Sequence, residues 1–267
     1  MENRPKIGVA LGSGSARGLA HIGVLQVLTE NSIPVDLIAG CSMGAMVGGI
    51  YATGADMKML GKMAENIDAK MFFDISYPRM GFIAGEKVKK LLSLLTKNKN
   101  FEDLDIPFYA VATDLISGQR VVLNEGSVME AIRASISIPG VFQPVKKDGM
   151  VLVDGAVTDL LPIEVAKSHG ADIIIAVEVN YTHSKETEIN SILDVLMTSL
   201  DIMQRVQFDL VEPKADILLK PKVGHFAPWD FGSVKQLIDL GRAETEPYIM
   251  KIKEMLNTPP ALPRGKS

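Results

Sequence analysis

The sequence predicts an α/β fold of three layers, in which helices cover both faces of a mostly parallel central sheet. Apolar runs that suit strands alternate along the chain with longer stretches that suit helices. The strand-like runs are continuously apolar, which is typical of strands buried on both faces. With 267 residues, the chain is long enough for one domain with a large core.

The elements follow one another in a regular order. The expected strands span residues 6–11, 35–40, 107–113, 120–123, 151–153, 172–179 and 216–220. The expected helices span residues 17–30, 43–53, 56–66, 86–96, 127–135, 162–168, 190–210 and 232–256. No linker divides the chain, so we expect residues 1–257 to form one catalytic domain and the Pro-rich residues 258–267 to form a frayed tail.

One uncharged segment, Leu37 to Ala55, is about long enough to cross a bilayer. It contains five glycines and is flanked by Asp36 and Asp56. A strand, a turn and a buried helix explain this composition better than a membrane span does.

Composition and charge exclude several classes of protein. A net charge of −4 gives no basic surface for nucleic acid. The single cysteine, Cys41, excludes an internal disulfide and fits a reducing compartment. The polar residues 1–6 lack the apolar stretch of a signal peptide, so we expect a cytoplasmic protein. Four scattered histidines and one cysteine have no metal-ligand spacing, and we expect no metal or other cofactor.

The most informative motif is Gly40-Cys41-Ser42-Met43-Gly44, at the junction of an expected strand and an expected helix. In this context G-x-S-x-G predicts a nucleophile elbow, a sharp turn that exposes the serine oxygen at the positive end of the helix. Small residues on both sides are needed because strand and helix nearly touch. We interpret Cys41 as a core residue, because it points into the fold. The alternative is a tight turn without chemistry.

A small-residue loop, Gly12-Ser13-Gly14-Ser15, follows the first expected strand and leads through Arg17 and Gly18 into a helix. Free backbone N–H groups in such a loop form an anion cradle. The loop lacks the Gly-Lys-Ser/Thr ending of a P-loop and the G-x-G-x-x-G spacing. Beside a nucleophile elbow, an oxyanion hole is the better interpretation.

A third motif is Asp154-Gly155 after the apolar run 151–153. It places a carboxylate at the carboxyl end of a strand, where ligands bind in open α/β sheets. In isolation, an Asp-Gly pair that caps a turn is about equally well supported.

Together, and in this order, these motifs resemble the patatin-like phospholipase family, and closely its small single-domain bacterial members. The resemblance runs over nearly the whole chain. It includes the loop ending in Arg17-Gly18 with the following run 21–25, the elbow, residues 112–115, the run 133–142, and Asp154-Gly155-Ala156.

The resemblance implies a serine hydrolase that acts on carboxylic esters of lipids through a serine–aspartate dyad. Ser42 would be the nucleophile and Asp154 the base. The oxyanion hole would use backbone N–H groups from Gly12, Ser13, Gly14 and Ser15, together with Met43. Supporting positions of the motifs are Arg17, Gly18, Gly40, Gly44 and Gly155. Ser13 and Ser15 depart from the run of glycines that is frequent in the family.

Three alternatives remain open. The order Ser42, Asp154 and then His183 or His225 suits an α/β-hydrolase triad; His21 and His169 lie in helical patterns and are expected to be structural. Transfer of the acyl group to a non-water acceptor is a second, although acyltransferases usually carry histidine where this chain has Cys41. The third is a non-catalytic regulator that retains the fold.

Two segments are candidates for lipid contact. Met57 to Phe82 is rich in methionine, phenylalanine and isoleucine, and flexible methionines suit varied acyl chains. The expected helix 190–210 carries an apolar stripe compatible with the core, a homodimer face or transient contact with a membrane surface; it lacks the basic face of an interfacial helix. The residues of the stripe are Ile192, Val195, Leu196, Ser199, Leu200 and Met203.

Arg17 and Arg133 could bind a phosphate head group. Each is at least as well explained as an internal ion-pair partner, for instance of Asp114 or Glu130. We interpret Asp114 as a structural carboxylate at a strand end.

Overall fold

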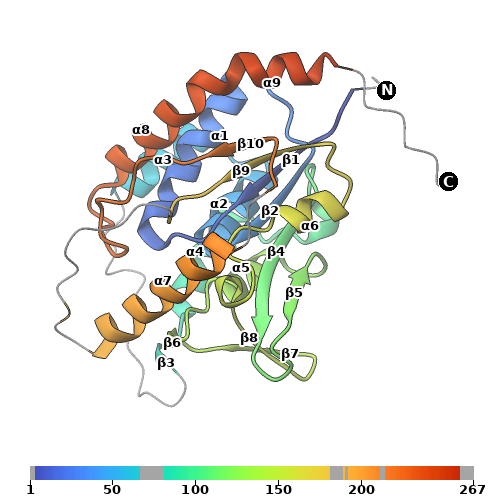
Figure 1. Ribbon diagram of the computed structural model, residues 1–267. Helices are drawn as coiled ribbons and strands as arrows, with labels where there is room; N and C mark the ends of the chain where they lie inside the picture. The colour runs from blue at the N-terminus through green and yellow to red at the C-terminus, as the bar shows by residue number, and fades with distance from the viewer. Residues whose placement is uncertain (1–3, 67–80, 181–188, 190–191, 211–213, 259–267) are drawn as a thin grey trace.

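The computed structural model describes residues 4–66, 81–180, 189, 192–210 and 214–258. A central sheet lies between helices (Figure 1). Its strand order is β10-β9-β1-β2-β4-β8-β7, with β5 also paired to β4. The strands are β1 (Ile7–Leu11), β2 (Leu37–Cys41), β4 (Phe108–Asp114), β5 (Arg120–Leu123), β7 (Val145–Lys147), β8 (Met150–Asp154), β9 (Ile173–Val177) and β10 (Ile217–Leu219).

The sheet has a parallel part and an antiparallel part. The strands from β10 to β4 pair in parallel, whereas β5 and β8 pair antiparallel to β4, and β7 pairs antiparallel to β8. Every residue of β1, β2 and β9 is buried, as expected for strands covered on both faces. Two short strands, β3 (Gly81–Ile83) and β6 (Gly140–Phe142), form a separate parallel pair.

β4 holds β2 and β8 along the same edge. β2 pairs with residues 108–111 of β4, and β8 pairs with residues 112–114. Both stretches overlap the residues 110–113 that pair with β5, so β5 occupies the other edge. Because β2 and β8 run in opposite directions, their carboxyl ends meet opposite the neighbouring residues Val111 and Ala112.

Helices form the outer layers. The α-helices are α1 (Ala20–Glu30), α2 (Met43–Ala52), α3 (Met57–Asn66), α4 (Glu86–Leu95), α5 (Val128–Ser135), α6 (Ile163–Ser168), α7 (Ile192–Leu210), α8 (Val234–Thr245) and α9 (Ile249–Leu256). Short 3₁₀ helices are η1 (Ser15–Leu19), η3 (Phe101–Asp103), η4 (Gly155–Val157) and η5 (Glu246–Tyr248). Figure 1 shows α1 and α8 side by side on one face.

Alternate side chains of the central strands enter two different cores. Ile7, Val9 and Leu11 pack with residues of α1, α2 and α8 on one face. Ala10 of the same strand packs on the other face with residues of the segment that leads into and forms α6. The three-layer α/β/α class predicted from the sequence is therefore confirmed.

The predicted elements correspond to observed ones, with a few differences. The strands β3, β6 and β7 were not predicted, because runs of three residues are too short to show a period. The helix expected over 232–256 is α8, η5 and α9, since Pro247 at the start of η5 interrupts the α-helical hydrogen bonds. The predicted tail lies outside the described residues from residue 259 onward, as do residues 67–80 of the Met57–Phe82 segment. No helix in the described part of the chain combines the length and apolarity needed to cross a membrane.

Candidate active site

Ser42 occupies a strained turn between β2 and α2. Its φ of 54° and ψ of −120° lie in a region that residues other than glycine rarely adopt. The Ser42 N–H donates a 2.9 Å hydrogen bond to Ser135 Oγ, and the Ser135 hydroxyl donates in turn to the Val111 carbonyl at 2.6 Å. The end of α5 and the middle of β4 therefore hold the turn in place.

The two glycines of the elbow motif allow close backbone contacts. A Cβ atom on Gly40 would lie 2.6 Å from Ala45 Cα, and one on Gly44 would lie 2.2 Å from the Leu11 carbonyl oxygen. Both neighbours are backbone atoms, which cannot turn aside as the end of a flexible side chain can. Any side chain at these positions would displace α2 from β1 and β2.

The hydroxyl of Ser42 donates a 2.5 Å hydrogen bond to Oδ2 of Asp154. Both residues are buried, each with 4% of its surface exposed. The other carboxylate oxygen, Oδ1, accepts the Ala156 N–H at 2.9 Å and a weak contact from Cys41 Sγ at 3.9 Å. Asp154 is thus oriented by η4 on one side and presented to the serine on the other.

Burial raises the pKa of Asp154 to about 6, although the hydrogen bonds from Ser42, Ala156 and Cys41 lower it. A carboxylate with this pKa is a stronger base than an ordinary aspartate and is still ionised at neutral pH. Burial also raises the pKa of the Cys41 thiol well above its usual range, so Cys41 is a protonated core residue.

The Gly-rich loop provides fewer free amides than its sequence suggests. The N–H of Gly12 donates to the Val177 carbonyl at 3.0 Å, and that of Ser13 donates to the Leu160 carbonyl at 2.9 Å. Within the described residues, the N–H groups of Gly14, Ser15 and Met43 donate to no acceptor. Of the five amides expected at an oxyanion hole, Gly12 and Ser13 are therefore engaged in holding the loop against β9 and the chain before α6.

Two buried side chains fasten this loop. His21 Nε2 lies 2.8 Å from the Gly12 carbonyl oxygen, and burial lowers the pKa of His21 to about 4, so the neutral ring donates this hydrogen bond. Arg17 is 1% exposed, and its Nε donates to the Phe226 carbonyl at 2.9 Å. Arg17 thus ties η1 to the chain before α8, and its burial argues against contact with a phosphate head group.

Arg133 and Asp114 also have internal partners. The guanidinium of Arg133 donates to Ser137 Oγ at 2.6 Å and to the carbonyls of Ala84 and Gln143, each at 3.0 Å, and it lies over the Phe142 ring. Asp114 accepts hydrogen bonds from Ile116, Ser117 and Val151, which close the turn after β4.

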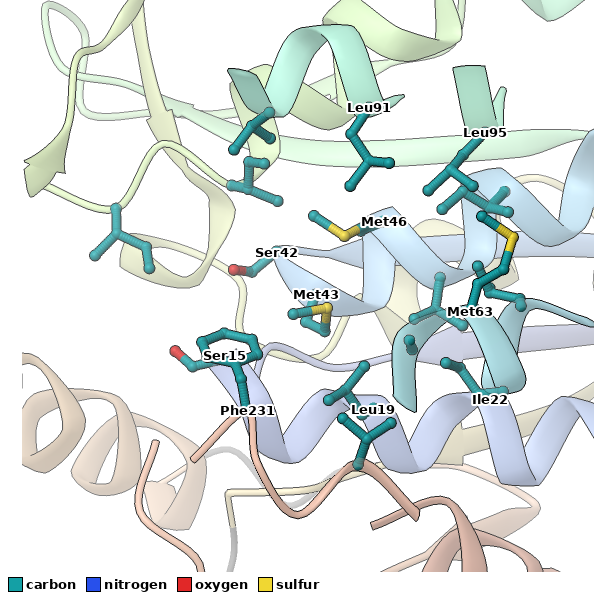
Figure 2. Close-up of a pocket in the computed structure, with 18 of the residues that line it drawn as sticks. Ser15, Leu19, Ile22, Ser42, Met43, Met46, Met63, Leu91, Leu95 and Phe231 are labelled. Atoms are coloured by element: carbon teal, nitrogen blue, oxygen red, sulfur yellow. The ribbon is translucent and has the colours of Figure 1, made fainter. Parts of the chain in front are cut away.

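An apolar pocket begins at Ser42 and runs along α2 (Figure 2). Ser15 lies near Ser42, while Leu95 and Met63 lie at the opposite end. The lining residues are Ser15, Leu19, Ile22, Ser42, Met43, Met46, Val47, Ile50, Leu60, Met63, Ala64, Val88, Leu91, Leu95, Ile136, Ile138, Phe142, Trp229, Phe231 and Val234. Leu60, Met63 and Ala64 belong to the Met-rich segment that the sequence suggested for lipid contact.

Comparison with known proteins identifies the family. The sequence model of the patatin-like phospholipases matches residues 9–167, which include the Gly-rich loop, the elbow and Asp154. The chain belongs to the patatin-like phospholipase family.

Among curated relatives, an uncharacterized NTE family protein of Mycobacterium tuberculosis is 41% identical over 179 residues, 66% of this chain and 49% of the relative. Lysophospholipase nte1 of Emericella nidulans is 27% identical over 95% of this chain and 19% of its own length. The chain spans about half the length of the mycobacterial relatives.

Solved structures share the patatin-like fold. VipD from Legionella pneumophila matches with a TM-score of 0.65 at 13% identity, covering 94% of this chain and 67% of VipD. The heterodimeric ExoU–SpcU complex of the Pseudomonas aeruginosa type III secretion system matches with a TM-score of 0.52 at 15% identity, covering 95% of this chain and 52% of the matched chain.

In the described part of this patatin-like chain, no histidine hydrogen-bonds to Ser42 or Asp154. His225 is exposed, with its ring against Phe226, and His169 at the end of α6 packs on Tyr109. His183 lies outside the described residues. The carboxylate oxygens of Asp154 are paired with Ser42, Ala156 and Cys41.

Sequence reasoning missed part of the pocket wall. Ile138 and Phe142 come from the segment around β6, and Trp229 and Phe231 come from the loop before α8. The run 133–142 was noticed only as part of the family resemblance. The Trp-Asp-Phe loop carries no catalytic motif, so only its aromatic content could have suggested a role.

Proposed function

We propose that the protein hydrolyses carboxylic esters of lipids, with Ser42 as nucleophile and Asp154 as general base. The observation that carries this proposal is the 2.5 Å hydrogen bond between the two side chains at one end of an apolar pocket. The names of the relatives, which include lysophospholipases, support the same class of substrate.

In the first step, Asp154 accepts the proton of the Ser42 hydroxyl as Oγ attacks the ester carbonyl carbon. Collapse of the tetrahedral intermediate breaks the bond to the alcohol, and Asp154 returns the proton to the departing oxygen. The acyl group then remains as an ester on Ser42.

In the second step, water attacks the acyl-serine, and Asp154 accepts its proton. The bond between Ser42 Oγ and the acyl carbon breaks, the proton returns to Oγ, and the fatty acid leaves. One carboxylate thus serves as the base in both steps, because it lies beside the Oγ atom at which both reactions take place.

The negative charge that develops on the carbonyl oxygen needs hydrogen-bond donors in a site without water. The amides of Gly14, Ser15 and Met43 are candidates, because they have no acceptor in the described structure. Ser15, Ser42 and Met43 all line the same pocket. The positive end of α2 adds a favourable field at Ser42.

The test is covalent labelling with a small fluorophosphonate, read by intact mass and peptide mapping. We expect one adduct on Ser42 in the wild type, no adduct in Ser42→Ala, and wild-type labelling in Ser168→Ala, whose hydroxyl lies on α6 and bonds to the Val165 carbonyl. Absence of an adduct on the folded wild type would instead favour the non-catalytic alternative.

A further inference from the structure

We propose that the pocket beside Ser42 is an acyl-chain groove of limited length, which selects esters of fatty acids with about eight to ten carbons. The groove rests on the proposed function for its role, but its occupant and length follow from its own lining.

The lining specifies a hydrocarbon ligand. Ser15 and Ser42 both line the pocket, and Figure 2 shows them with Phe231 toward the same end of it. Among the described residues, the rest of the wall is formed by aliphatic, methionine and aromatic side chains, and none of these lining residues carries a charge. A charged or strongly polar ligand would lose its hydration without compensation there, whereas a methylene chain gains from burial.

The length of this groove follows from the two helices that line it, α2 and α4. α2 contributes Met43, Met46, Val47 and Ile50, and α4 contributes residues from Val88 to Leu95. Each stretch advances seven residues, which at 1.5 Å per residue is about 10 Å. An extended hydrocarbon with C–C bonds of about 1.5 Å advances roughly 1.3 Å per carbon. About eight carbons beyond the carbonyl therefore lie alongside α2.

Helix α3 forms the distal wall. It contributes Leu60, Met63 and Ala64, and Figure 2 places Met63 with Leu95 and Ile22 at the end away from Ser42. Met59, one turn before Met63 on the same helix, is 64% exposed and does not line the groove. Met63 and Met59 are therefore a matched pair for mutation, because truncation of Met63 enlarges the groove and truncation of Met59 does not.

The chain also contains a built-in reporter. Trp229 is its only tryptophan, and its side chain lines the groove. Binding of a fatty acid, the expected product, can therefore be followed by intrinsic fluorescence without any turnover. This readout separates failure of the groove from failure of the catalytic proposal.

The experiment titrates the wild type with straight-chain fatty acids of 4 to about 16 carbons, below their micelle concentrations. We expect the affinity to rise about fourfold per added carbon, the factor that corresponds to about 0.8 kcal/mol per buried methylene. The rise should stop at about eight to ten carbons, and kcat/KM for the matching p-nitrophenyl esters should level off at the same length.

Variants on α3 test the distal wall. Met63→Ala should move the levelling-off to longer chains by about two or three carbons, the length of the removed side chain, whereas Met59→Ala should leave it unchanged. Ala64→Phe should shorten it, with about tenfold weaker binding of decanoate.

Affinity that keeps rising to 16 carbons in the wild type would overturn the length limit. Identical profiles for Met63→Ala and Met59→Ala would overturn the assignment of α3 as the distal wall. Length-limited binding of fatty acids without labelling of Ser42 would support the groove and reject the hydrolase. Labelling of Ser42 without any dependence of binding on chain length would support the hydrolase and reject the groove.

Discussion

Asp154 Oδ2 accepts the Ser42 hydroxyl at 2.5 Å even though Ser42 directly follows β2 and Asp154 ends β8, two strands that run in opposite directions. When two antiparallel strands pair directly with each other, their carboxyl ends lie at opposite ends of the pair. Here β2 and β8 take consecutive portions of one edge of β4, so their ends meet in the middle. The contact between Ser42 and Asp154 is thus a product of strand register.

Replacing Asp154 with asparagine should remove most activity. The amide preserves the shape of the side chain but cannot accept the serine proton, and general-base catalysis contributes typically about 10²–10⁴ in rate. We expect kcat for a short-chain ester to fall by about 10³. Asp159→Asn is the control, because that carboxylate pairs with Arg120 instead. Near-wild-type turnover in Asp154→Asn would refute the dyad.

The pH dependence of activity should follow the pKa of Asp154. Since only the ionised carboxylate accepts a proton, kcat/KM should rise tenfold per pH unit at low pH and level off above a midpoint near 6. The measurement is a pH profile with a neutral ester substrate. A midpoint near the ordinary aspartate value of about 4 would show that burial does not tune this group.

The same pKa shift predicts an effect on stability. A carboxyl group whose pKa is raised to about 6 in the folded state binds a proton more tightly there than in the unfolded chain. The stability that protonation of this carboxyl group adds to the folded state is complete below about pH 4, and it is lost as the pH rises to about 6. Asp154→Asn has no such loss. Between pH 4 and pH 8, its free energy of unfolding should therefore rise relative to that of the wild type by about 2–3 kcal/mol, at about 1.36 kcal/mol per pKa unit.

Urea denaturation of both proteins at the two pH values measures this difference. Other buried acids, such as Glu178, are present in both proteins and cancel in the comparison. An equal difference between the two proteins at pH 4 and pH 8 would contradict the assignment of the raised pKa to Asp154.

His21 is expected to act as a positioning residue for the Gly-rich loop. Its Nε2–H donates to the Gly12 carbonyl at 2.8 Å. The amides of Gly14 and Ser15, which donate to no acceptor within the described residues, come two and three positions later in the chain. His21→Phe should lower kcat by about 10²-fold with little change in KM, since loss of one oxyanion donor costs about 10²–10³.

Two variants separate positioning from general stability. His21→Gln retains an N–H donor and should recover part of kcat. His169→Phe replaces a ring that packs on Tyr109 away from the pocket and should leave kcat unchanged. Equal losses in kcat for His21→Phe and His21→Gln would argue against a role for the Gly12 hydrogen bond.

Gly44→Ala should disrupt the elbow. The added methyl group would lie 2.2 Å from the Leu11 carbonyl oxygen, so α2 must move away from β1. Overpacking costs typically about 1–3 kcal/mol, and we expect a loss at the upper end together with loss of Ser42 labelling. Gly232→Ala is the control, because the nearest atom to its added methyl group is a carboxylate oxygen at 3.4 Å. Thermal unfolding and labelling rates provide the two measurements.

The local parts of the site could be read from the sequence because each depends on neighbours along the chain. The elbow needs small residues two positions either side of Ser42, and the strand and helix beside it show in the apolar pattern. The Gly-rich loop is visible for the same reason. Conformation at these points is set by which residues the backbone can accommodate in a sharp turn.

Which amides of that loop are free could not be read in this way. Gly12 and Ser13 donate to Val177 and Leu160, which lie far along the chain, and Arg17 reaches the carbonyl of Phe226. The pocket likewise combines α2 with Trp229 and Phe231. No sequence period connects such distant segments, because their contacts depend on how the layers pack.

The sequence by itself determined that a serine would stand on a strained turn and that an aspartate would end a strand. Only the tertiary structure decided that they meet, because the meeting depends on the register of both strands on β4. A shift of two residues along β4 would separate the side chains by about 6–7 Å, at about 3.3 Å per residue, without changing either motif. Long-range hydrogen bonding between strands, which leaves no local mark in the sequence, assembled the site.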